Sequence, residues 1–219
     1  MLILVLDAST PVVSVALAEE DRVLTEISVS ARGASEALLP AVDAALNLAG
    51  EELASVERLL VGVGPGTFTG IRIAAATARA LSLSTGAALS KNSTLAALAA
   101  PAHACRTDVL AVLDARRGQV FAQRFSEVGP TTNISCVKPE DLSAERPPLV
   151  VGDGAVRYRS ALSPLGHIPP DDSPLHRVTA TGHVLTADLT PVSADDLVPI
   201  YVREPDAEVR RDLNPWSRP

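Results

Sequence analysis

The stretch Leu2-Ile3-Leu4-Val5-Leu6-Asp7-Ala8-Ser9-Thr10 opens the chain with an apolar run that ends at an acid and is soon followed by two hydroxyl side chains. A short continuous apolar run is typical of a buried central strand. Residues 12–18 and 23–30 predict two further strands, joined by the polar hairpin 19–22. The chain therefore begins with three consecutive strands, and Asp7 ends the first of them.

Helical and strand patterns alternate after these strands. Apolar residues recur at helical spacing between residues 38 and 49, and Gly50 is placed to end that helix. Residues 59–63 predict a buried strand, a Gly-rich loop follows, and an Ala-rich helix is expected over about 70–84. Ser93, in Asn92-Ser93-Thr94, is typical of a helix cap. Three strands followed by helix-linked strands match a ribonuclease-H-like core, the repeating unit of the actin-like ATPases.

An internal repeat extends this interpretation to the whole chain. Val5-Leu6-Asp7-Ala8 recurs as Val112-Leu113-Asp114-Ala115, 107 residues later, at the start of a second pair of predicted strands. The repeat indicates a duplication. We predict an α/β, actin-like duplicated fold with two lobes, each a mixed sheet flanked by helices. The expected boundaries are 1–105 for the first lobe, 106–203 for a degenerate second lobe and 204–219 for a mobile tail, with a short helix over 193–198.

Composition excludes several classes of protein. The 219 residues carry a net charge of −7 and only 3% aromatic side chains, which disfavours a chain that grips nucleic acid by itself. No apolar stretch approaches membrane-spanning length and no basic leader precedes Leu2, so a cytoplasmic location is expected. The two cysteines and four histidines show no metal-ligand spacing, and we expect the histidines on loops or surfaces.

Two segments could face a phosphate group. In an actin-like ATPase the hairpin after the first strand approaches the phosphates, and the Gly-rich loop before a helix offers backbone amides to anions. The favoured alternative is that these residues only satisfy turns and permit close packing. The second copy, Asp114-Ala115-Arg116-Arg117, lacks the hydroxyl groups. We therefore expect no catalytic residue and at most a vestigial phosphate site, whose candidate residues are Asp7, Ser9, Thr10, Gly64, Gly66 and Thr67.

The two long predicted helices carry faces of small side chains. Such faces let another helix approach closely, either from the same fold or from a partner, and the two alternatives have about even odds. The residues expected at a partner interface are Leu38, Ala41, Ala45, Gly70, Ile73, Ala74, Thr77, Ala78 and Leu81.

The string from Gly62 to Arg72, Gly-Val-Gly-Pro-Gly-Thr-Phe-Thr-Gly-Ile-Arg, is similar to the most characteristic motif of the TsaB family. Residues 4–10, 92–95, 151–155 and 199–203 resemble other segments of that family, so that the resemblance spans about residues 1–203. It implies an actin-like fold in two lobes. It also implies partnership with TsaD, the related subunit that transfers threonylcarbamoyl to the adenosine adjacent to the anticodon in tRNA.

The resemblance implies a non-catalytic subunit that binds and activates TsaD in a heterodimer, with TsaE joining a larger complex. The same surface would form a homodimer when the chain is alone, and tRNA would be contacted only through the complex. TsaD carries metal-binding histidines on its first helix, and residues 34–39 here contain none, so no metal is expected. No cofactor is expected to be required, and ATP or ADP is expected only at the junction with TsaD. The alternative is an ATP-binding phosphotransferase or ATPase of the actin-like superfamily that uses Asp7 and Ser9.

Overall fold

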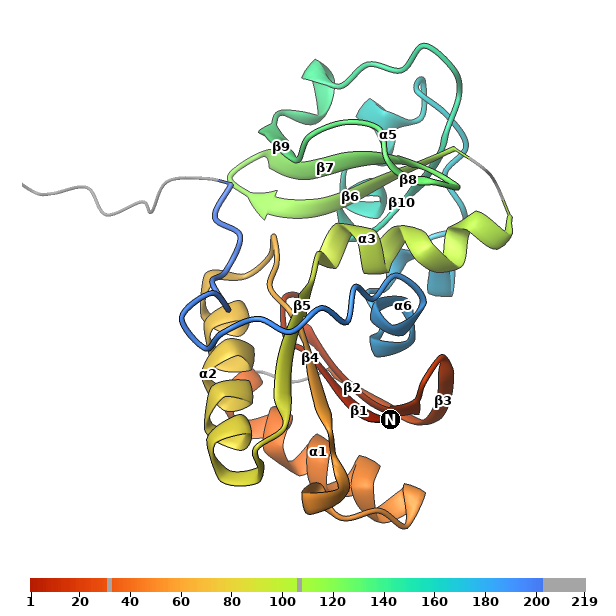
Figure 1. Cartoon of the computed structure of the whole chain (residues 1–219). Coiled ribbons are helices and arrows are strands. Elements are labelled where there is room, and N and C mark those ends of the chain that lie inside the picture. The colour runs from red at the N-terminus through yellow and green to blue at the C-terminus, as the bar shows by residue number, and fades with distance from the viewer. Residues whose placement is uncertain (31–32, 106–107, 203–219) are drawn as a thin grey trace, which may run out of the picture.

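A computed structural model describes residues 1–30, 33–105 and 108–202 and arranges them as two lobes, each built on one sheet (Figure 1). The first sheet has the strand order β3-β2-β1-β4-β5, with β1 antiparallel to β2 and parallel to β4. Its strands are β1 (Leu2–Asp7), β2 (Val12–Glu19), β3 (Arg22–Ser30), β4 (Arg58–Gly62) and β5 (Ala88–Asn92). The three leading strands and the buried strand near residue 60 confirm the sequence prediction.

The second sheet repeats the start of the first. Its order is β10-β6-β7-β8, with β9 also paired to β7, and β6 runs antiparallel to β7 and parallel to β10. The strands are β6 (Val109–Arg116), β7 (Gln119–Ser126), β8 (Gly129–Pro130), β9 (Ser135–Val137) and β10 (Leu149–Val151). The two mixed sheets confirm the predicted duplication.

The central strand β1 is buried on both faces, which explains its continuous apolar run. Leu4 and Leu6 point into a cluster with helices α1 and α2, whereas Ile3 and Val5 pack on the opposite side with helix α6. These helices are α1 (Ala34–Ala49), α2 (Phe68–Thr85) and α6 (Ala180–Leu185). Gly50 follows the last residue of α1 and ends the helix, as predicted, and it adopts a left-handed conformation.

The two lobes exchange a helix. Helix α3 (Thr94–Ala99) belongs by sequence to the first lobe, but Leu95 and Leu98 pack in the core of the second sheet. Helix α6 comes late in the chain and packs on the first sheet. Figure 1 shows both helices between the two sheets. The hydrophobic clusters thus divide the chain differently from the ranges 1–105 and 106–203. Ser93 caps α3 by accepting from the Ala96 amide, as predicted.

The remaining elements are short. They are η1 (Leu53–Ser55), η2 (Ala100–Ala104), η3 (Pro139–Asp141), α4 (Asp153–Arg157), α5 (Arg159–Leu162) and η4 (Pro174–His176). The helix predicted over 193–198 was wrong: Ser193 starts a single turn, closed by the amides of Asp196 and Leu197, and the chain then continues without a helix. Pro199 follows and cannot donate to a further turn.

Two further expectations concern the tail and membrane-spanning helices. The predicted tail, 204–219, lies outside the described residues. Within them, no helix combines the length and the apolar character that crossing a membrane requires.

Candidate functional site

The hairpin between β1 and β2 is organised around the buried carboxylate of Asp7. One oxygen, Oδ1, accepts hydrogen bonds from the Ser9 amide at 2.9 Å and the Ser9 hydroxyl at 2.7 Å. The other oxygen, Oδ2, lies 2.9 Å from Nε2 of His183. Burial raises the pKa of Asp7, but the hydrogen bonds and the charge of His183, together with the bonds from Ser9, outweigh that effect and lower the pKa below its usual value. Asp7 is therefore held as a carboxylate in the interior.

The Gly-rich loop packs directly on this hairpin. A Cβ atom at Gly66 would lie 2.2 Å from the carbonyl oxygen of Ser9, and one at Gly70 would lie 1.8 Å from that of Ala8. The Thr67 amide donates to the Ser9 carbonyl at 2.7 Å. Only glycine permits such a close approach of two backbones. The backbones of the Gly-rich loop and of the β1–β2 hairpin are thus in direct contact.

The six candidate phosphate residues lie on the hairpin and the Gly-rich loop, and most of them make hydrogen bonds within the fold. Asp7 and Ser9 are buried and bonded to each other, and Thr10 exchanges hydrogen bonds with Val12. The carbonyl of Gly64 accepts from the Thr94 amide at the start of α3. This geometry agrees with the alternative in which the residues satisfy turns and close packing. A phosphate-binding role for them stays a prediction.

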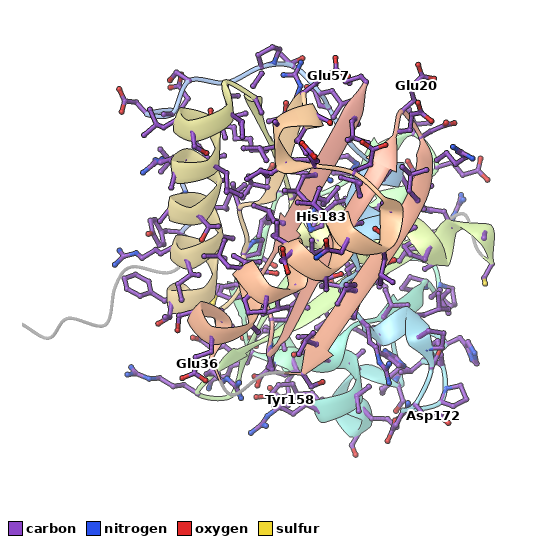
Figure 2. The ribbon with its side chains drawn as sticks, turned by 90° about the horizontal axis from the view of Figure 1, so that it is seen from below. Glu20, Glu36, Glu57, Tyr158, Asp172 and His183 are labelled. Carbon is purple, nitrogen blue, oxygen red and sulfur yellow. The ribbon has the colours of Figure 1, made fainter. Side chains whose placement is uncertain are left out.

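His183 corrects the expectation that the histidines lie on loops or surfaces. It lies on α6, is fully buried and points into the interior (Figure 2), and its Nδ1 atom has no hydrogen-bond partner among the described residues. His176 is buried as well, and its Nδ1 atom accepts from the Gly152 amide at 3.1 Å. His183 and Asp7 are 176 residues apart, so no local pattern could pair them. Across the described residues, no three His, Cys, Asp or Glu side chains gather in a way that could hold a metal ion.

The corresponding hairpin of the second lobe has a different surface. Asp114 repeats Asp7, but its carboxylate contacts Arg116 at 3.3 Å and Arg157 at 3.6 Å and accepts from the Tyr158 hydroxyl. Arg116 and Arg117 have φ angles of 64° and 53°. A left-handed backbone costs an L-residue about 1–2 kcal/mol. The second hairpin therefore places two strained arginines where the first has small residues.

The residues predicted for a partner interface divide into two groups. Six of them lie in the chain's own core, which corrects their placement on a surface: Leu38, Ala41, Ala45, Gly70, Ala74 and Ala78. They face the first sheet or the neighbouring helix, because α1 and α2 cover one side of that sheet. The other three, Ile73, Thr77 and Leu81, are half-buried. A partner interface on these two helices stays a prediction, and its surface has to be formed by other residues.

The outer side of α2 is the face that the sequence did not single out. Five exposed residues follow one another along it at intervals of three or four and are mostly apolar: Phe68, Arg72, Ala76, Ala80 and Leu83. At its N-terminal end, the Arg72 guanidinium lies 3.5 Å from the centre of the Phe68 ring, and its Nε donates to the Tyr201 hydroxyl at 2.8 Å. Tyr201 and Phe68 are 43% and 45% exposed. We call these six residues the α2 face.

Comparison with known proteins identifies the family. The family model described as "TsaD: tRNA N6-adenosine threonylcarbamoyltransferase" matches residues 25–146. The tRNA threonylcarbamoyladenosine biosynthesis protein TsaB of Bacillus subtilis is 31% identical over 162 residues, which cover 69% of this chain and 71% of that protein. The chain belongs to the TsaB family. The prediction that the motif around the Gly-rich loop indicates the TsaB family is thus confirmed.

Solved structures agree with this placement. YeaZ from Pseudomonas aeruginosa superposes with a TM-score of 0.79 at 25% identity, over 91% of this TsaB-family chain and 99% of that chain. The ethanolamine utilization protein EutJ from Carboxydothermus hydrogenoformans is 13% identical, with a TM-score of 0.52 over 85% of this chain and 89% of that one, and so shares the fold alone. The predicted duplicated actin-like fold is confirmed.

Proposed function

We propose that this TsaB-family chain is a non-catalytic subunit that binds and activates TsaD for threonylcarbamoyl transfer to the adenosine adjacent to the anticodon in tRNA. The observation that carries the proposal is the α2 face, an exposed apolar surface that starts within the family's most characteristic motif. Membership in a family of tRNA threonylcarbamoyladenosine biosynthesis proteins supports the pathway.

The α2 face has the composition of a protein-binding surface. Leu83 is 87% exposed, and the small side chains of Ala76 and Ala80 would let a partner helix approach closely. Aromatic residues and arginine are the types most often found where binding energy concentrates. Arg72 already stacks on Phe68 and donates to the Tyr201 hydroxyl, so that less side-chain freedom is lost when a partner binds.

Helix α1 lies next to this surface and packs beside α2 on the same side of the first sheet (Figure 1). Leu39 and Leu48 on it are 52% and 74% exposed. They are nine residues apart and so lie on opposite flanks of the helix, of which one faces the side of α2. Two adjacent helices with exposed apolar residues fit a pair of similar helices from a related subunit. In the absence of TsaD the same surface can pair with a second copy of this chain, because related interfaces often self-associate in a two-fold arrangement.

The first hairpin supports a non-catalytic role. An acid that holds a metal or activates water has to reach the substrate, but both oxygens of Asp7 are bonded inside the fold and the residue is 0% exposed. The Gly-rich loop lies on the hairpin's own backbone. In our proposal ATP or ADP, where bound, lies at the junction with TsaD, and TsaE joins a larger complex.

Glutamate substitutions on the α2 face test the proposal. Ala76→Glu and Ala80→Glu place charge at exposed positions and should leave folding intact. They should weaken TsaD binding more than about 30-fold, the size of an interface hot spot of about 2 kcal/mol, and reduce tRNA modification in a reconstituted assay. Ala54→Glu is the matched control, because Ala54 is exposed on η1, outside both helices. Calorimetric titration with TsaD measures the affinity.

Two results would contradict the proposal. If both variants bind TsaD as tightly as the control does, the α2 face is not the interface. If the wild-type chain neither binds TsaD nor increases modification of tRNA, the role as an activating subunit is wrong.

A further inference from the structure

We propose that residues 203–219, which we call the C-terminal segment, fold back over the α2 face when no partner is bound. Leu213 and Trp216 then cover the apolar residues of that face, and TsaD has to displace them in order to bind. This inference rests on the proposed function in one respect, because it takes the α2 face as the surface that binds TsaD. It goes beyond that function in assigning to the chain a contact that regulates its own binding surface.

The C-terminal segment starts at one end of the α2 face. The ring centre of Tyr201, a member of that face, lies 5.7 Å from that of Phe68 at the start of α2. Val202 is the last described residue, and Figure 1 shows this part of the chain beside the start of α2. The residues from 203 to 213 span up to about 36 Å when extended, whereas the 18 residues of α2 span about 27 Å. The segment is therefore long enough to follow the whole helix.

The point from which the segment leaves is fixed against the first lobe. Leu197 is fully buried in the core, and its carbonyl accepts a hydrogen bond from Arg79 of α2 at 2.9 Å. The Ile200 amide donates to the Val63 carbonyl at 2.8 Å. A segment tethered at the edge of a surface meets that surface at an effective concentration of about millimolar. Contacts too weak to hold a separate peptide can therefore keep the C-terminal segment on the α2 face.

The segment carries apolar side chains that suit this surface. Aromatic residues make up only 3% of the chain, yet its single tryptophan, Trp216, follows Tyr201 by 15 residues. Leu213 lies close to it in sequence. Tryptophan has a large apolar surface that is stabilised by burial, and Leu83 near the end of α2 is highly exposed. A contact between the segment and the α2 face removes apolar surface of both from water.

The charges of the segment follow an order that matches α2. The helix has no acidic residue in its first turn and no basic residue in its last turn, and its charged residues are Arg72 and Arg79. Residues 203–209 contain three acidic residues and one arginine, whereas residues 210–219 contain three arginines and one acidic residue. A helix has a partial positive charge at its start and a partial negative charge at its end. A segment that runs from the start of α2 toward its end therefore places unlike charges together.

Fluorescence of Trp216 tests the contact, because it is the only tryptophan of the chain. The full chain, diluted and without TsaD, is compared with a synthetic peptide of residues 203–219. Acrylamide quenching in the full chain should be about fivefold weaker than in the peptide, which corresponds to a face uncovered for about one-fifth of the time. Ala76→Glu places a charge on the α2 face and should restore the quenching seen in the peptide. The control Ala54→Glu, outside both helices, should leave the Trp216 ring protected.

Variants of the segment test its effect on TsaD binding. Leu213→Asp/Trp216→Asp removes the two apolar side chains, and the control Asn214→Asp/Ser217→Asp adds the same charge at neighbouring positions. Covering the face reduces the apparent affinity to the fraction of molecules in which it is uncovered, so the first variant should bind TsaD about fivefold more tightly than the wild type. The control should bind as the wild type does. Calorimetric titration gives the affinities.

The outcomes separate this inference from the proposed function. Quenching needs no TsaD, so a wild-type chain that fails to bind TsaD overturns the proposed function and the regulation, while quenching still decides the contact. Quenching as strong as in the peptide, or protection that Ala76→Glu leaves unchanged, overturns the contact with the α2 face. Protection that disappears on dilution shows that the segment comes from a second copy of the chain and overturns the fold-back arrangement. Equal TsaD affinities for the Leu213→Asp/Trp216→Asp variant and its control overturn the regulation.

Discussion

The two hairpins that follow β1 and β6 start from the same four residues and end in opposite environments. In the first, Asp7 is buried, paired with His183 and covered by the Gly-rich loop. In the second, Asp114 lies just beneath a surface of exposed arginines. The difference shows that a repeated backbone position can become an internal junction in one lobe and a charged surface in the other.

The junction in the first lobe also connects distant parts of the chain. His183 reaches Asp7 from α6, which follows the second sheet in sequence. The Glu26 carboxylate and the Ser14 hydroxyl accept from the Ala180 amide at the start of the same helix. These polar contacts fix α6 against the first sheet, so the first hairpin contributes to the arrangement of the lobes. In the second hairpin, Asp114 is bonded to Arg116, Arg157 and Tyr158 of its own lobe.

The largest effect expected from this comparison is on stability. Asp7→Ala should lower the free energy of unfolding by about 3–5 kcal/mol, because it leaves His183 buried without its partner. Asp114→Ala should cost only about 1–2 kcal/mol, since Arg116 and Arg157 can be hydrated when the carboxylate is removed. Urea unfolding of both variants at pH 7 gives the two values.

A double variant checks the cause. Asp7→Ala/His183→Ala should be destabilised by less than the sum of the two single variants, because the second substitution removes the group that the first leaves unpaired. Additive losses, or an equal cost at Asp7 and Asp114, would show that the two hairpins do not differ in the way described.

Much of the fold follows from local patterns. The continuous apolar run before Asp7 predicts a strand buried on both faces, and Gly50 and Ser93 mark helix ends because their backbone or side chain supplies what a helix terminus lacks. The exposed face of α2 could not be predicted in this way. Alanine is compatible with both core and surface positions, so an Ala-rich helix has no sharp apolar stripe, and Ala74 could not be distinguished from Ala76 by residue type.

The candidate site shows a second limit of local patterns. The pairing of Asp7 with His183 depends on how α6 packs across the first sheet, and no sequence pattern next to either residue indicates the pairing. The left-handed arginines are unpredictable for the opposite reason, because residue preference argues against the conformation that they adopt.

A smaller loss of stability is expected when alanine replaces a glycine at a close contact between two backbone segments. Gly70→Ala should destabilise the chain by about 1–3 kcal/mol, because its methyl group would meet the Ala8 carbonyl, which cannot move without disturbing the hairpin. In the second lobe, Gly154→Ala should cost less, since the nearest atoms lie at 2.9 Å. Gly33→Ala is the control, with only the Ser35 hydroxyl oxygen at 3.7 Å. Thermal unfolding ranks the three variants, and a larger loss at Gly154 than at Gly70 would contradict the order expected from these contact distances.

The smallest effect concerns how the two hairpins respond to pH. The pKa of Asp7 is lowered, so its contribution to stability is present above the ordinary pKa near 3.8 and is lost as pH falls through the lower folded value. The pKa of Asp153, beside Asp114, is raised by burial. Above pH 3.8 the folded state therefore binds more protons than the unfolded state, and the free energy of unfolding falls as pH rises through the folded pKa.

Asp153→Asn keeps an oxygen that can accept from the Asp114 amide and removes the buried charge. Relative to the wild type, the variant should gain stability as pH rises from 4 toward 7, by less than about 1 kcal/mol. Urea midpoints at several pH values measure the gain, and a variant whose deficit grows with pH would show that the Asp153 charge stabilises the second hairpin, as that of Asp7 stabilises the first.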